Sequence, residues 1–189
     1  GSFVGNVNFG GDLSSNTAGT SNFRAGVNAG NSIASGGNYN VVIGDEAGTA
    51  LTTGDDNVAI GFEALKTEDE HGRNVAVGYQ SLKTLNAGVV AVTTTVGYKS
   101  GTSLTTGVQN VLIGGLAGDA LTDADFNVAV GNNTLTTDTQ GSKSTAVGYE
   151  ALTAQNFTSA TDSHNTAVGY QAGLSVTTGK QNTLIGGLS

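Results

Sequence analysis

Apolar residues recur along this chain at a fixed spacing, inside a five-residue word of the form Asn-Val-Ala-Val-Gly. Six of the ten intervals between successive words are identical, and the others differ from them by only one to four positions. A constant period of about 17 residues predicts a tandem-repeat architecture. The eleven words begin at Asn6, Asn22, Asn40, Asn57, Asn74, Thr93, Asn110, Asn127, Ser144, Asn165 and Asn182.

Within each repeat we number positions from the first residue of the word. Position four is apolar in every copy, and position five is always glycine, which adopts turn conformations that other residues avoid. We therefore expect each copy to be a short strand that ends in a glycine turn. The turn glycines are Gly10, Gly26, Gly44, Gly61, Gly78, Gly97, Gly114, Gly131, Gly148, Gly169 and Gly186.

A unit of this length is too short for a pair of helices but suits one coil of a β-solenoid. The β-branched residues of the word favour strands, and the absence of proline suits strands that donate every ladder hydrogen bond. We predict an all-β, parallel β-solenoid of about eleven coils. It forms one domain over residues 1–189, which we expect to be a segment of a longer fibrous protein.

Side chains alternate along a strand, so positions two and four share a face and position three points the other way. Position four is large and aliphatic, which predicts the core of the coil. Position three would then be an exposed column of mostly small apolar residues, and such stripes mark interfaces. We therefore predict an oligomer interface at Val42, Ala59, Ala76, Leu112, Ala129, Ala146, Ala167 and Leu184.

The composition restricts the classes of partner that this chain can bind and the kinds of site that it can form. Only 12% of residues are charged and the formal net charge is −8, so nucleic acid is a poor candidate partner because phosphate binding needs clustered Lys and Arg. No apolar run approaches the length of a membrane span. The absence of cysteine excludes disulfides and thiolate metal sites. We expect no cofactor and no insertion of this segment into a membrane.

The words Asn57-Val-Ala-Ile-Gly61 and Asn74-Val-Ala-Val-Gly78 resemble the head repeats of YadA-like trimeric autotransporter adhesins. The string Asn165-Thr-Ala-Val-Gly-Tyr-Gln-Ala-Gly173 is similar to related repeats of phage tail fibres, and this variant favours a phage origin. The resemblance implies a left-handed β-roll, a homotrimer, an extracellular or virion location, and a role in attachment. The period of this chain exceeds the roughly 14 residues of the simplest head repeats, so we expect longer outer turns.

Two rows of residues at fixed repeat positions could bind ligands. For the asparagines of position one we favour an internal ladder, in which amides of stacked coils bond one another and cap the turns. Aromatic residues occupy position six in five copies: Phe62, Tyr79, Tyr98, Tyr149 and Tyr170. We expect them to pack on the neighbouring coil, with sugar binding as the alternative.

The densest charged run is Glu68-Asp69-Glu70-His71. Adjacent side chains on an extended segment diverge, so we expect a solvated turn rather than a cation site. A serine-type triad would need His71 or His164, the only two histidines, and both lie in polar segments that do not suggest a pre-organised base. We therefore predict no enzymatic activity, no catalytic residues and no metal ligands.

Two copies carry longer segments, at residues 84–92 and 155–164. Insertions in solenoids map to surface loops, which often carry recognition. The candidate recognition residues are Leu85, Asn86, Asn156, Phe157 and His164, with Phe157 as an exposed aromatic.

Three functions remain open from the sequence. The first is a fibre or adhesin head that presents loops to a cell-surface glycan or protein. The second is a purely structural spacer. The third is a repetitive-surface protein of the ice-binding kind, although a regular Thr-x-Thr lattice is not evident.

Overall fold

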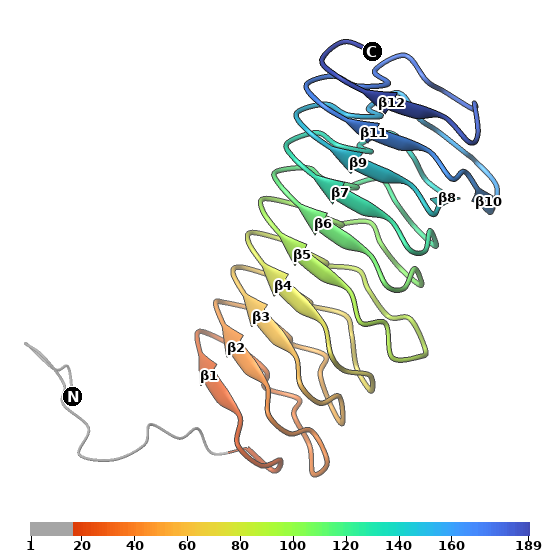
Figure 1. Cartoon of the computed structure of the whole chain (residues 1–189). Helices are drawn as coiled ribbons and strands as arrows, with labels where there is room; N and C mark the ends of the chain where they lie inside the picture. Colours follow the sequence, from red (N-terminus) through yellow and green to blue (C-terminus); the bar gives the residue numbers. More distant parts are fainter. Residues whose placement is uncertain (1–16) are drawn as a thin grey trace, which may run out of the picture.

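The computed structural model describes residues 17–189, so the repeat that begins at Asn6 lies outside the described residues. Figure 1 shows successive coils stacked along one axis, each contributing one short strand to a sheet that runs the length of the stack. No helix, and hence no helix able to cross a membrane, occurs in the described part of the chain. The ten strands of this sheet are β1 (Phe23–Ala25), β2 (Val41–Ile43), β3 (Val58–Ile60), β4 (Val75–Val77), β5 (Thr94–Val96), β6 (Val111–Ile113), β7 (Val128–Val130), β9 (Thr145–Val147), β11 (Thr166–Val168) and β12 (Thr183–Ile185).

Every pair of neighbouring strands in the sheet is parallel and pairs equal repeat positions. Ala59 of β3, for example, lies opposite Ala76 of β4. A second, two-stranded parallel sheet joins β8 (Gly141–Ser142) to β10 (Thr161–Asp162) in the same stack of coils, apart from the main sheet. The fold is therefore a parallel β-solenoid in which each sequence repeat makes one coil, as predicted.

The two faces of the strands are the reverse of the prediction. Position three points into the solenoid: Val42, Ala59, Ala76, Leu112, Ala129, Ala146 and Ala167 are fully buried, and Leu184 packs against the core. Positions two and four point outward. The predicted oligomer interface at position three is thus wrong, because the column that it names fills the interior of the chain itself.

The reason is the narrow interior of a coil. Leucines from the opposite wall occupy most of that space, so the strand can contribute only a small side chain. Where position nine is leucine, position three is alanine, as in the pair Ala129 and Leu135. Where position nine is glycine, position three is larger in four of five copies, as in the pair Leu112 and Gly118. A Cβ on Gly118 would lie only 3.0 Å from Leu112 Cδ2 and 2.7 Å from Leu121 Cδ1.

Position nine also has an unusual backbone. Its φ lies between 49° and 65° in the nine copies for which the structure describes it, whether the residue is glycine or leucine. Leu65, Leu82, Leu135 and Leu152 accept this left-handed conformation, which costs a non-glycine residue about 1–2 kcal/mol. Their full burial offsets that cost.

The position-five glycines behave as predicted. Gly78 has a φ of 138°, and a Cβ built on it would lie 2.2 Å from the carbonyl oxygen of Gly97 in the next coil. Any side chain here would therefore strain the turn and push adjacent coils apart. The same close approach recurs from coil to coil, so the glycine column sets how tightly the coils stack.

The asparagines of position one form the predicted internal ladder. The Asn127 amide N–H donates to Asn110 Oδ1 over 2.9 Å, and Asn127 Oδ1 accepts from the Ser144 amide over 2.9 Å. The Asn127 side-chain Nδ2 donates to the carbonyl of Gly141, which closes the turn of the same coil. These amides satisfy buried backbone groups and are buried themselves.

Candidate interaction surfaces

The outward face of the main sheet is apolar and carries no charge. In β2 to β7, β9, β11 and β12, positions two and four are all Val, Ile or Thr. Most of these side chains are half-buried by their neighbours in the ladder, while Ile113 and Val168 are 37% exposed. We call this surface, made of positions two and four, the valine face. It is the apolar stripe that the sequence analysis assigned to position three.

An aromatic ladder lies at position six, beyond the glycine turn. Ring centroids are 5.4 Å apart between Phe62 and Tyr79 and 5.5 Å apart between Tyr79 and Tyr98, with nearly parallel planes. Tyr149 and Tyr170 stack in the same way at 5.5 Å. These contacts confirm the prediction that the aromatic residues of position six pack on the neighbouring coil. Each ring is still 41–56% exposed, so the ladder also offers an apolar surface to solvent.

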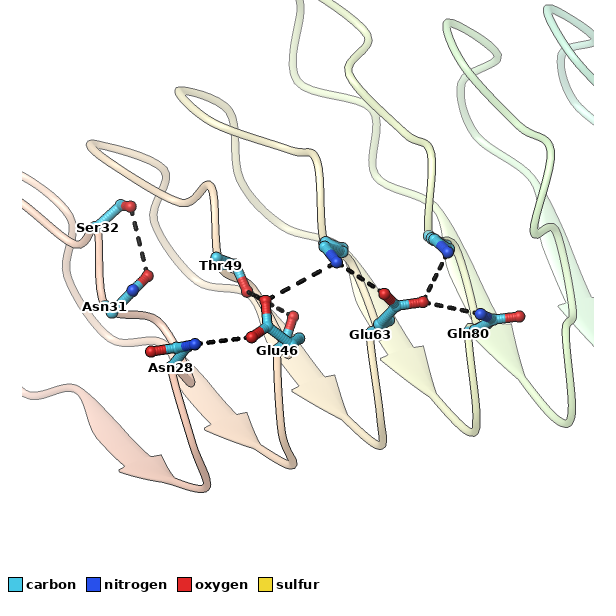
Figure 2. A network of polar contacts seen from close by, with 9 residues as sticks. Asn28, Asn31, Ser32, Glu46, Thr49, Glu63 and Gln80 are labelled. Atoms are coloured by element: carbon cyan, nitrogen blue, oxygen red, sulfur yellow. Dashed lines mark hydrogen bonds and ion pairs between the residues drawn. The ribbon is translucent and has the colours of Figure 1, made fainter.

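A polar network runs along the turns at position seven (Figure 2). Glu63 is its centre: Lys66 Nζ lies 2.7 Å from Oε1, and Lys83 Nζ lies 2.6 Å from Oε2. Gln80 Nε2 also donates to Oε2 over 2.8 Å. These contacts, with Lys66 the largest contributor, lower the pKa of Glu63 from 4.5 to about 2. The network links neighbouring coils, and each carboxylate oxygen of Glu63 is paired with a lysine.

The five candidate recognition residues differ in their exposure to solvent. Leu85 is fully buried and belongs to the core, and Phe157 is only 7% exposed. The prediction that Phe157 is an exposed aromatic is wrong, because its ring covers Gly141 of the preceding coil and its amide donates to Asp138 Oδ1. Asn86 and His164 are exposed and Asn156 is half-buried.

The exposed apolar residues of the first insertion are Val89, Val90 and Val92, which are 45–54% exposed. Sequence reasoning missed them. Three valines within four residues of a polar, glycine-containing segment were the available signal. Whether either insertion recognises a partner stays a prediction.

The charged run around Glu68 does not diverge as predicted. Ligand atoms of Glu68, Asp69 and His71 all lie within 4.8 Å of one another. The chain bends here, and the His71 amide donates to Glu68 Oε1 over 3.2 Å, which brings the imidazole back toward the carboxylate. The expectation of an extended segment was the error.

Comparison with known proteins adds no relative: neither a family model, nor a curated protein, nor a solved structure matches this chain. Fold and surfaces therefore rest on the repeat and on the geometry described above.

Proposed function

We propose that this chain is a non-enzymatic fibre segment that self-associates through the valine face, most simply as a homotrimer, and serves in attachment to a cell surface. The valine face is the observation that carries the proposal. An uncharged apolar stripe along the main sheet of a solenoid is the kind of surface that proteins cover. The resemblance to trimeric adhesin heads and phage tail fibres supports an extracellular or virion setting.

A second copy of the chain is the occupant that fits best. The apolar columns of the valine face repeat at the strand spacing of about 4.8 Å, and an identical rod presents the same spacing. Side chains of two or three copies can therefore interdigitate along the full stack. A partner that lacks this axial repeat, such as a globular domain, could match only a few coils.

Light scattering on the 18.7 kDa chain tests the association. We expect a mass three times that of the monomer, and a monomer at all concentrations would refute self-association. The triple variant Ile113→Lys, Val130→Lys and Val168→Lys should be monomeric with an unchanged circular dichroism spectrum. A lysine at these outward positions is solvated in the monomer, but it would be buried against another copy in the assembly. If it stays assembled, the valine face is not the interface.

The matched control places the same three charges on exposed turn residues: Thr53→Lys, Thr106→Lys and Thr178→Lys. This variant has the same net charge and should keep the mass of the parent protein.

Attachment needs its own test. We expect the parent protein to bind a subset of immobilised cell-surface glycans or intact cells, and we expect Tyr79→Ala with Tyr98→Ala to weaken binding if the aromatic ladder is the contact. Absence of binding by an assembled trimer would leave a structural spacer as the better description.

A further inference from the structure

The cluster formed by Glu68, Asp69 and His71 has buried polar atoms that the protein itself does not satisfy. Glu68 is fully buried, yet its Oε2 has no hydrogen-bond partner. His71 Nδ1 is also buried without a partner, and it lies 3.6 Å from Glu68 Oε1, beyond hydrogen-bonding distance. Leaving such groups unpaired costs about 1–3 kcal/mol each. A ligand bound between the two side chains would pair with both atoms and remove both costs.

The equivalent position of another coil shows what a satisfied buried acid looks like. Asp138 occupies position twelve of its repeat, as Glu68 does. Asp138 Oδ1 accepts from the amides of Gly141 and Phe157, and Oδ2 accepts from Gln155 Nε2 over 2.5 Å. Both oxygens of Asp138 are therefore paired within the protein.

The Glu68 coil keeps the backbone contact, because the His71 amide donates to Glu68 Oε1 as the Gly141 amide donates to Asp138 Oδ1, but it lacks the glutamine. The next coil places Leu85 at position twelve, so the glutamine amide that pairs Asp138 Oδ2 has no counterpart at that position. Burial raises the pKa of Glu68, although the amides of His71 and Ala87 act to lower it. In place of the Thr139 and Gly141 of the Asp138 coil, this coil has Asp69 and His71. This coil therefore places two metal-ligand side chains beside a buried acid whose Oε2 has no hydrogen-bond partner.

We propose that Glu68, Asp69 and His71 bind a divalent first-row transition ion, with zinc as its simplest occupant. Two carboxylates and one imidazole suit zinc or manganese, whereas calcium takes six to eight oxygens. Ligand atoms around tetrahedral zinc lie about 3.3 Å apart, given bonds near 2.0 Å, so small rotations of the Asp69 and His71 side chains suffice. Water completes the fourth position.

The site has an entrance and a structural consequence. His71 lines a surface hollow of about 150 Å³ together with Asp55, Glu70 and Val90, which gives the ion a path from solvent. The carbonyl of Asp69 accepts the amides of Thr52 and Gly54 from the preceding coil. A bound ion would therefore hold the turn that joins two coils, whether or not the chain self-associates.

Titration of the EDTA-treated protein with zinc chloride, followed by calorimetry, tests the site. We expect saturable binding of one ion per chain, a rise in melting temperature with zinc but not with calcium, and visible d–d absorption with cobalt. His71→Asn should weaken zinc binding by more than the roughly 10–100-fold that outer partners of a metal ligand contribute. Asp69→Asn should do the same.

His164→Asn and Glu70→Gln are the matched controls, since they change the other histidine and the exposed neighbouring acid. Both should bind zinc like the parent protein. Absence of saturable binding, or binding that survives His71→Asn in a variant with an unchanged circular dichroism spectrum, would overturn the proposal.

Discussion

The left-handed backbone of position nine makes a prediction opposite to the usual rule for glycine. Leu135 is fully buried and has a φ of 49°. Replacing it with alanine should lower the free energy of unfolding by about 2.7–5.0 kcal/mol, the range for a leucine that leaves a cavity. Replacing it with glycine leaves a similar cavity but removes the left-handed strain.

The magnitude of the difference follows from two opposing effects. Relief of the strain returns about 1–2 kcal/mol. The greater freedom of glycine in the unfolded chain takes back about 0.4–1 kcal/mol. Leu135→Gly should therefore be more stable than Leu135→Ala by about 0–1.6 kcal/mol, with a central value of about 0.8 kcal/mol, although glycine in a regular element is normally the worse choice.

Urea denaturation of the two variants at one protein concentration measures the difference, because the midpoint shifts while the slope stays constant. Leu121 provides the control: it is equally buried but has no positive φ, so there glycine should be the less stable substitution. If Leu135→Gly is less stable than Leu135→Ala, strain at position nine does not contribute as argued.

Two further predictions concern the polar ladders. Because the pKa of Glu63 falls from 4.5 to about 2 in the folded state, its contact with Lys66 stabilises the fold above pH 4.5 and is lost as the pH falls toward 2. The stability gap between the parent protein and Glu63→Gln, up to about 1 kcal/mol, should close over that range in acid denaturation; a constant gap would contradict the assignment. Asn127→Ala should cost about 2–4 kcal/mol in urea denaturation, because it strands the buried amide of Ser144, whereas the exposed Asn132→Ala should cost almost nothing.

The repeat period determined the fold because every coil uses the same word. The spacing, the glycine of position five and the asparagine ladder were all readable from the sequence, and the structure bears them out. The face of the strand that points into the coil could not be predicted from the sequence, because the rule that larger side chains face inward fails in a coil this thin. The exchange of size between positions three and nine, visible at Ala129 and Leu135, was the signal that could have corrected it.

The local sites needed the structure. The convergence of Glu68 and His71 depends on a bend within a turn of their own coil, and no pattern in four adjacent polar residues encodes that bend. Burial of Phe157 depends on a loop folding back over Gly141, which in turn depends on the pairing of β8 with β10. The burial of Phe157 thus arises from contacts between coils.

The stacking of neighbours also bears on how the chain folds. Strands of the main sheet contact only the coil before and the coil after, so most pairings join residues about a tenth of the chain length apart. Sheet proteins usually close larger loops and fold slowly for that reason. Here a folded coil can template the next one, so folding can nucleate at any coil and propagate in both directions like a zipper. A damaged turn in the middle would then stop the zipper locally while both flanks complete their own stacks.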